Sequence, residues 1–240
     1  MMLLAGCGKP PEKEAPPTPV FFKPDPSTAG TVTGAIRFTG KNPPARKIDM
    51  DEDPRCASLH HGAVVDNAVE TGVNQGLAGV FVYVKSGLED KKFEPPTEPV
   101  TIEQKGCRFG PRVVAIRAGQ PLHVINSDPV THNIHPRAKE NREWNQSQEP
   151  GAPPLIRKFA RTEVLIRVKC NVHSWMRAWI GVVEHPYYAV TDSSGAFALP
   201  NLPPGKYTVA AVHGELGVRE REVTIEPSAK EALDFEFKGE

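Results

Sequence analysis

Proline and glycine interrupt this chain so often that only short regular segments fit between them. The 240 residues include 25 prolines and 20 glycines, and no stretch has the apolar period of a long helix. The intervening segments are short, rich in β-branched and aromatic residues, and bounded by Gly, Pro or Asp. This pattern predicts an all-β protein made of short strands and turns.

The expected strands fall into two groups that suggest two β-sandwiches. The first group covers Thr31–Phe38, Val80–Lys85, Val100–Gln104, Arg112–Arg117, Pro121–Asn126, Glu163–Lys169 and Ala178–Val183. The second covers Tyr188–Thr191, Ala196–Leu199, Lys206–His213, Arg219–Ile225 and Leu233–Phe237. We therefore expect a tether over residues 1–29, one domain over 30–185 and another over 186–240. Residues 41–79 and 136–160 are expected to be long loops, with room for a short helix within 137–148.

The charge of the chain argues against polyanionic partners. Lys plus Arg and Asp plus Glu both number 29, so the formal net charge is zero. No basic excess indicates binding to nucleic acid or to anionic lipid.

One loop concentrates the side chains that bind soft metals. Cys170, His173 and Met176 follow one another at intervals of three residues, so a thiolate, an imidazole and a thioether share seven residues. His132, which follows an expected strand by a short turn, can supply a second imidazole. Two histidines and one cysteine with a weak methionine contact are the ligands of a type 1, or blue, copper site. The sequence thus predicts one copper ion as the cofactor.

Strand alternation predicts which way the cysteine points. Val164, Ile166 and Val168 are apolar, whereas Arg167 and Lys169 are charged, so counting on by two places Cys170 on the inward face. We expect its sulfur to be buried. His173, further along the loop, is expected nearer the surface, where its ring edge could pass an electron to a partner.

Residues 100–184 resemble a cupredoxin, and the loop spacing is most similar to that of amicyanin. The resemblance rests on His132-Asn133-Ile134-His135 and on the run from Cys170 to Arg177. It implies a Greek-key β-sandwich in which His132, Cys170, His173 and Met176 bind copper. It also implies that Asn133 hydrogen-bonds across to the cysteine loop and that His135 does not bind the metal. Ser174 stands where amicyanin has proline.

The last 55 residues resemble the carboxypeptidase regulatory-like or rhamnogalacturonan-lyase-associated β-sandwich, a carbohydrate-binding-like fold. The segments that carry this similarity are 191–197 and 201–209, which are turn and core positions. They therefore imply a fold and no ligand. The whole chain also resembles bacterial lipoproteins that join these two modules, some of which carry a methylamine-utilisation label.

The N-terminus predicts export and lipid attachment. Leu4-Ala5-Gly6-Cys7 resembles a bacterial lipobox, with Cys7 as the lipidated residue. Only six residues precede Cys7, fewer than a secretory signal needs, so we expect the true start to lie further upstream. The proline-rich residues 8–29 are expected to form an extended tether. The protein would then sit in the bacterial cell envelope, on the periplasmic side or at the surface, with lipid as its only membrane contact.

Two cysteines remain once Cys7 and Cys170 have these roles. In an oxidising compartment Cys56 and Cys107 are expected to form a disulfide. The alternative is a second metal site made by Cys56 with His60 and His61.

These features favour an electron carrier over an enzyme. The eight histidines leave no second cluster large enough for a copper oxidase, apart from His60-His61, and no catalytic triad can be argued. We expect a redox protein partner, such as a cytochrome or a dehydrogenase. The alternatives are a cell-envelope binding module, with a glycan held by the C-terminal sandwich, and a copper storage or delivery protein. The aromatic residues Phe197, Tyr207, Phe235 and Phe237 follow strand patterns, so we expect them in the core.

Overall fold

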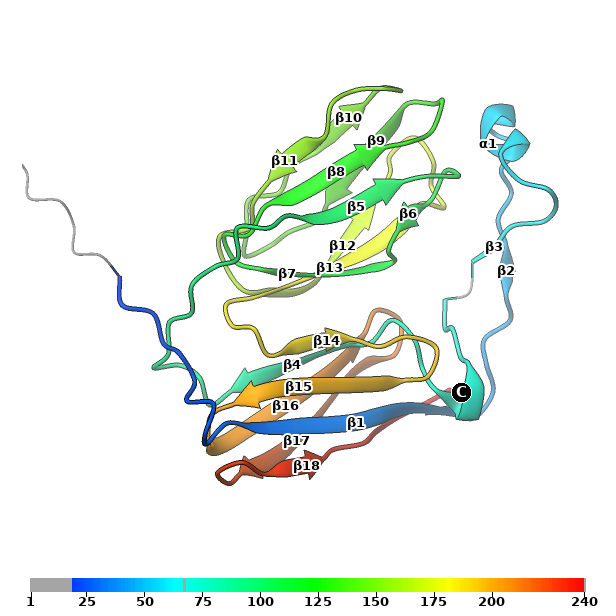
Figure 1. Cartoon of the computed structure of the whole chain (residues 1–240). Helices are drawn as coiled ribbons and strands as arrows, with labels where there is room; N and C mark the ends of the chain where they lie inside the picture. Colours follow the sequence, from blue (N-terminus) through cyan, green and yellow to red (C-terminus); the bar gives the residue numbers. More distant parts are fainter. Residues whose placement is uncertain (1–18, 67, 240) are drawn as a thin grey trace, which may run out of the picture.

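The computed structural model describes residues 19–66 and 68–239, and nearly all of the regular secondary structure within them is β-strand. The expected lipidation site at Cys7 and most of the expected tether lie outside these residues. The strands form two sandwiches placed one above the other (Figure 1). The all-β prediction is confirmed.

The first sandwich contains strands β5 to β13. One sheet has the order β10 (Gln146–Gln148), β9 (His132–Pro136), β12 (Glu163–Lys169), β13 (Arg177–Val183) and β7 (Val113–Arg117). The other has the order β11 (Leu155–Arg157), β8 (Leu122–Asn126), β5 (Val100–Gln104) and β6 (Phe109–Gly110). Alternate residues of both sheets, such as Ile102, Val124, Ile166 and Ile180, meet in one buried core.

The second sandwich combines strands from both ends of the described chain. One sheet has the order β15 (Ala196–Leu202), β1 (Gly30–Thr39) and β18 (Lys230–Ala232), and β19 (Phe235–Lys238) also pairs with β1. The other has the order β14 (Tyr188–Val190), β4 (Phe81–Ser86), β16 (Gly205–His213) and β17 (Gly217–Ile225).

This pairing corrects the expected domain boundary at residue 185. Strands β1 and β4 were expected in the first domain, but β1 pairs with β15, β18 and β19, and β4 lies between β14 and β16. Val32, Ile36 and Phe38 of β1 are buried in the core of the second sandwich. The first sandwich is therefore inserted between β4 and β14. Sequence order misled the prediction, because strand pairs more than 100 residues apart leave no local signal.

The segment between β1 and β4 forms an arm, defined here as residues 40–66 and 68–79. It leaves the second sandwich, rises beside the first, and returns (Figure 1). The short strands β2 (Arg46–Lys47) and β3 (Val65–Asp66) pair with each other, and α1 (Pro54–Ser58) forms the tip. Asp53 caps α1 by accepting a hydrogen bond from the backbone N–H of Arg55 at 3.0 Å. The one-turn 3-10 helix η1 (Val73–Gln75) precedes β4.

The other expected loop, residues 136–160, contains β10 and β11 and no helix, so the short helix expected within 137–148 is wrong. The carboxylate of Glu163 instead accepts hydrogen bonds from the backbone N–H groups of Lys139, Glu140 and Asn141. These contacts hold the chain in a turn, because one carboxylate satisfies three donors that a helix would bond internally.

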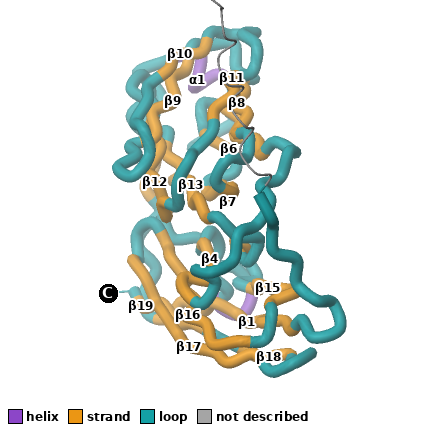
Figure 2. Tube along the Cα trace, turned by 90° about the vertical axis from the view of Figure 1, so that its left-hand side faces the viewer, coloured by secondary structure: helices purple, strands orange, loops and turns teal. Residues whose placement is uncertain are grey.

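The two sandwiches are in direct contact through packed side chains. Phe81 of β4 packs with Val113 and Val183 of the first sandwich in a small separate core. Gly181 allows this close approach, because a Cβ atom there would lie 2.8 Å from the Phe81 ring. The end-to-end stacking is visible from the side in Figure 2. In the residues with described placement, no helix is both long and apolar enough to cross a membrane.

We predict that acid destabilises the protein through His213, a buried residue of β16. Burial, aided by the nearby Arg112 cation, lowers the pKa of His213 to about 4. The unfolded state, with a pKa near 6.5, therefore binds more protons, so stability is present at pH 7 and is lost as the pH falls towards 4. His213→Gln should remove about 2 kcal/mol of the difference between the unfolding free energies at pH 7 and pH 4.5.

Urea titrations at the two pH values measure this difference, and His123→Gln, on the half-buried His123 of β8, is the matched control. An unchanged pH dependence in His213→Gln would contradict the assignment.

Candidate metal site

Cys170 lies at the end of β12 with its side chain turned into the first sandwich. Ile166, Val168 and Cys170 are all buried, at 2%, 0% and 2% exposure, so the predicted burial of the sulfur is confirmed. Val164 does not join this core and packs at the junction of the two sandwiches instead. A register shift between Glu163 and Ile166 interrupts the alternation of inward and outward side chains. Every second residue of β12 therefore points inward only from Ile166 onward.

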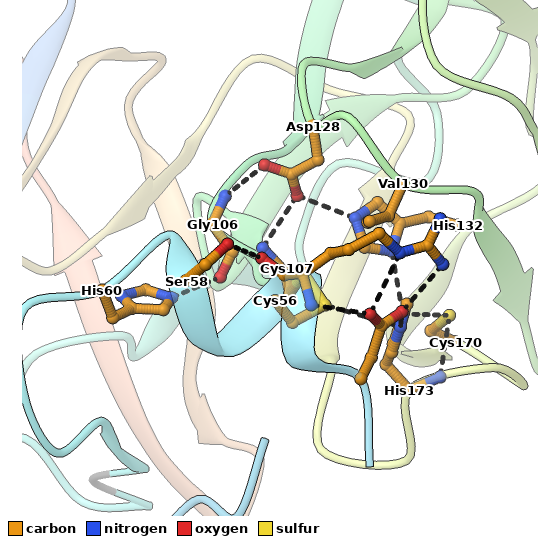
Figure 3. Close-up of a disulfide and its surroundings, with 12 residues drawn as sticks. Cys56, Ser58, His60, Gly106, Cys107, Asp128, Val130, His132, Cys170 and His173 are labelled. Atoms are coloured by element: carbon orange, nitrogen blue, oxygen red, sulfur yellow. Dashed lines mark hydrogen bonds and ion pairs between the residues drawn. A yellow bond between two sulfur atoms is a disulfide. The ribbon is translucent and has the colours of Figure 1, made fainter. Parts of the chain in front are cut away.

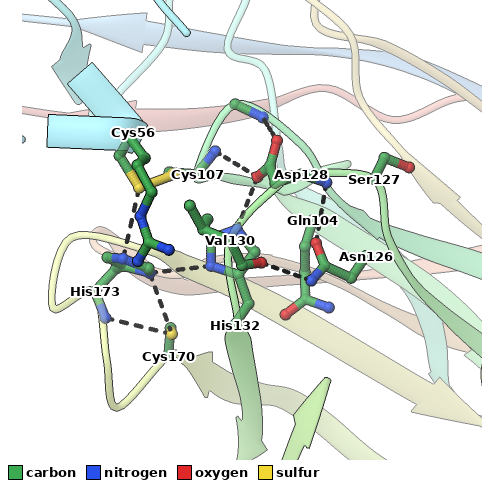
Figure 4. Close-up of polar contacts among 12 residues, drawn as sticks. Cys56, Gln104, Cys107, Asn126, Ser127, Asp128, Val130, His132, Cys170 and His173 are labelled. Carbon is green, nitrogen blue, oxygen red and sulfur yellow. Dashed lines mark hydrogen bonds and ion pairs between the residues drawn. A yellow bond between two sulfur atoms is a disulfide. The ribbon is translucent and has the colours of Figure 1, made fainter. Parts of the chain in front are cut away.

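The two histidines of the expected site face each other beside this sulfur (Figure 4). His132 begins β9 and His173 lies in the loop after β12, and their Nδ1 atoms are 3.0 Å apart. The Nδ1 atom of His173 lies 3.9 Å from Sγ of Cys170. One potential ligand atom from each of the three residues lies within 4.8 Å of the other two. Ligands bonded to one metal ion at about 2.0–2.3 Å are themselves separated by roughly 3–4 Å. The three residues therefore fit a single ion.

Met176 closes the loop that holds two of these ligands. Its backbone N–H donates to the His173 carbonyl at 3.0 Å, and its own carbonyl accepts from the Cys170 N–H at 3.3 Å. The side chain is 1% exposed and belongs to the same core cluster as Cys170. The turn thus returns the chain to β13 with the thioether buried in the core that also holds the cysteine.

Each imidazole is held from its other nitrogen by a carboxylate. Nε2 of His132 lies 2.7 Å from Asp128, and Nε2 of His173 lies 3.2 Å from Asp53. Hydrogen bonds from Arg55 lower the pKa of Asp53 to about 2, so this group is an anion at neutral pH. A proton held on Nε2 by a carboxylate leaves Nδ1 free to bind a metal.

Burial and hydrogen bonding compete at these groups. Burial raises the pKa of Cys170, but hydrogen bonds from His132 and from the His173 N–H outweigh it and lower that pKa overall. Burial likewise opposes the negative charge of Asp128, yet hydrogen bonds from His132 and two backbone N–H groups lower its pKa. Burial lowers the pKa of His173. A thiolate and a neutral imidazole are the forms that bind metals.

The pKa of His132 is raised, whereas that of His173 is lowered. Burial alone would lower the pKa of His132, but hydrogen bonds to Asp128 and Cys170 raise it. The anions around His132 thus attract positive charge to this position. A metal cation bound at Nδ1 would meet the same attraction.

The position of His173 differs from expectation, because the residue is only 2% exposed. The tip of the arm covers it: Asp53 lies against Nε2, and Sγ of Cys56 lies 3.5 Å from the same nitrogen. The Trp175 ring covers another side, with its centroid 5.1 Å from that of the imidazole. Sequence reasoning missed this cover, since Asp53 lies 120 positions before His173.

Cys56 and Cys107 form a disulfide that fastens this cover to the first sandwich (Figure 3). Nε2 of His60 contacts the Gly106 carbonyl at 2.9 Å, and His61 is exposed. Within residues 19–66 and 68–239, neither histidine joins a cluster of His, Cys, Asp or Glu side chains that could hold a metal ion. The alternative metal site at Cys56, His60 and His61 is therefore not formed.

Two further residues occupy the places that the cupredoxin resemblance implies. The side-chain oxygen of Asn133 accepts a hydrogen bond from the Asn171 N–H at 2.8 Å, which ties β9 to the cysteine loop. Both ring nitrogens of His135 have other neighbours: Nε2 lies 2.6 Å from Glu143 and Nδ1 lies 3.4 Å from Asn171.

Four aromatic residues of the second sandwich lie in its core. Phe197, Tyr207, Phe235 and Phe237 are 6%, 3%, 4% and 0% exposed, as expected for core residues.

No protein-family model and no curated protein matches this chain. Among solved structures, amicyanin from Paracoccus versutus is 18% identical, with a TM-score of 0.32 over 42% of this chain and 96% of its own. A purple cupredoxin from Nitrosopumilus maritimus is 17% identical, with a TM-score of 0.30 over 35% of this chain and 98% of its own.

A copper-containing nitrite reductase from Thermus scotoductus is 20% identical, with a TM-score of 0.34 over 42% of this chain. The similarity spans only 25% of the reductase. Residue assignments here rest on the geometry of the site.

We predict that the disulfide keeps His173 covered. Cys56→Ala combined with Cys107→Ala releases a constraint that spans 51 residues, and it should lower the unfolding free energy by roughly 2–4 kcal/mol. The arm tip should then exchange its amide hydrogens faster, and His173 should become accessible to an acylating reagent.

Hydrogen exchange measures the protection of the arm tip, and mass spectrometry measures the acylation of His173. Ser58→Ala is the control, because it alters the same helix and leaves the disulfide in place. Unchanged protection of residues 50–59 in the double variant would show that the cover does not depend on the disulfide.

Proposed function

We propose that this protein is a one-electron carrier with a single type 1 copper ion. His132, Cys170 and His173 would hold the ion as strong ligands, and Met176 would add a weaker thioether contact. The observation that supports this most directly is the convergence of two Nδ1 atoms and one sulfur, with a carboxylate behind each imidazole. Two imidazoles, a thiolate and a thioether favour copper over the harder divalent cations.

The burial of the site favours electron transfer over catalysis. The three strong ligands are 0–2% exposed, and a cavity lined in part by Met176 has a volume of about 30 Å³, the space of one or two waters. A substrate would need an open coordination position and a cleft. Ligands held by second-layer hydrogen bonds change position little when the charge of the ion changes, which suits a carrier.

Copper storage or delivery is the competing role for the same ligands. A protein that hands over its metal needs an exit route, whereas here the arm tip and a disulfide cover His173. We therefore favour the carrier.

The cellular setting is part of the proposal. The lipobox-like residues before Cys7 support export and lipid attachment, and a disulfide suits the oxidising cell envelope. The chain would then exchange electrons with a cytochrome or a dehydrogenase of the envelope.

Substitutions of single ligands test the assignment. Met176→Leu removes a donor that stabilises the oxidised ion, so the reduction potential should rise while the blue absorption persists. Cys170→Ser removes the sulfur responsible for the intense visible band, so the colour should disappear.

Voltammetry and visible spectroscopy record both results. Met50→Leu is the matched control, because Met50 is a buried methionine of the arm. If Met176→Leu shifts the potential no more than Met50→Leu does, Met176 is a packing residue and the axial assignment is wrong.

A further inference from the structure

A partner protein cannot approach the proposed copper site through the ring of His173. Asp53 and Cys56 of the arm occupy the outer side of that ring, and Trp175 lies against it. The ring is 2% exposed. A docking surface close to the site must therefore lie on another face of the first sandwich.

The outward face of β12 and β13 lies directly beside the ligand loop. Lys169 precedes Cys170, Arg177 follows Met176, and these two cations are opposite each other in the antiparallel pair. Arg167 points outward two residues earlier, opposite Trp179. The strands are neighbours in one sheet on the side shown in Figure 2.

The three cations on the outward face of β12 and β13 form no ion pairs within the described residues. Across the residues that the structure describes, no ion pair involves Arg167, Lys169 or Arg177. Like charges directly opposite each other on a sheet are destabilising. Lys169 and Arg177, the two cations at the ends of the ligand loop, thus repel each other and form no ion pair within the described residues.

A groove extends the positive surface. It has a volume of about 620 Å³ and is lined by Arg137, Lys139, Arg167 and Lys169, together with Trp179 and the apolar side chains of Val164 and Leu165. Its one carboxylate, Glu163, is engaged by three backbone N–H groups. Arg137 pairs with Glu143, which leaves the other cations free for an external anion.

We propose that this cationic face, formed by Arg137, Lys139, Arg167, Lys169 and Arg177, is the docking surface for an acidic redox protein. Such a partner would place carboxylates against the exposed cations and apolar atoms against Trp179, within reach of the Cys170 loop. The redox character of the partner rests on the proposed function, whereas anion binding does not. A concave patch on a chain of zero net charge suits an acidic protein better than a flat anionic membrane.

Paramagnetic mapping by NMR tests the surface on the whole chain kept reduced, and so diamagnetic. Hexacyanochromate(III), a trianion, should broaden the amide signals of Arg167–Lys169 and Arg177–Trp179 most strongly. Hexaamminechromium(III), a trication, should leave them sharp. Polyglutamate, as a stand-in for an acidic protein surface, should shift the same signals, and salt should reverse the effect.

Charge reversal supplies the decisive comparison. Arg167→Glu with Lys169→Glu should weaken polyglutamate binding roughly tenfold. Lys206→Glu with Lys230→Glu, on exposed sites of the second sandwich, changes the net charge equally and should not. Equal weakening by both pairs, or broadening spread over the whole surface, would overturn the proposal. Stronger binding to phosphatidylglycerol vesicles than to polyglutamate would assign the face to a membrane instead.

The blue absorption of the wild-type protein, recorded beside the anion mapping, distinguishes a failure of the docking surface from a failure of the proposed function. A colourless wild-type protein with intact anion mapping would refute the copper carrier and leave an anion-binding face. A blue protein whose anion mapping fails would refute the docking surface alone.

Discussion

The placement of two buried imidazoles, each fixed by a carboxylate on its Nε2 side, is the constraint on which the rest of the site depends. Asp128 fixes His132 within four residues of chain, and Asp53 fixes His173 from the distant arm. Both Nδ1 atoms are thereby directed to the same point beside Cys170. Burying polar rings without such partners would cost several kcal/mol, so the carboxylates both orient and stabilise the site.

The arm explains why two sandwiches are joined in one chain. Strands β1 and β4 belong to the second sandwich, so the arm between them is anchored at both of its ends. From that base its tip reaches the first sandwich, where the Cys56–Cys107 disulfide and the Asp53–His173 contact hold it. The second sandwich thus supports the candidate metal site without contributing one of its residues.

Local sequence patterns predicted the parts of the structure that depend on local physics. Alternation placed Cys170 inside, and the spacing of Cys170, His173 and Met176 indicated one loop, because these signals need only neighbouring residues. The resemblance, rather than any pattern, supplied the bracing role of Asn133. The inserted topology, Asp53 and the burial of His173 could not be predicted, since they depend on contacts between residues more than 100 positions apart. Asp128 left a weak signal, as an acidic residue four positions before His132.

The most direct test of the central claim is X-ray absorption spectroscopy of the whole chain loaded with one equivalent of copper. The account predicts one short copper–sulfur bond and two imidazole nitrogens in the oxidised protein, with little change in these distances on reduction. A first shell that contains only nitrogen and oxygen would contradict it, because Cys170 would then lie outside the coordination sphere.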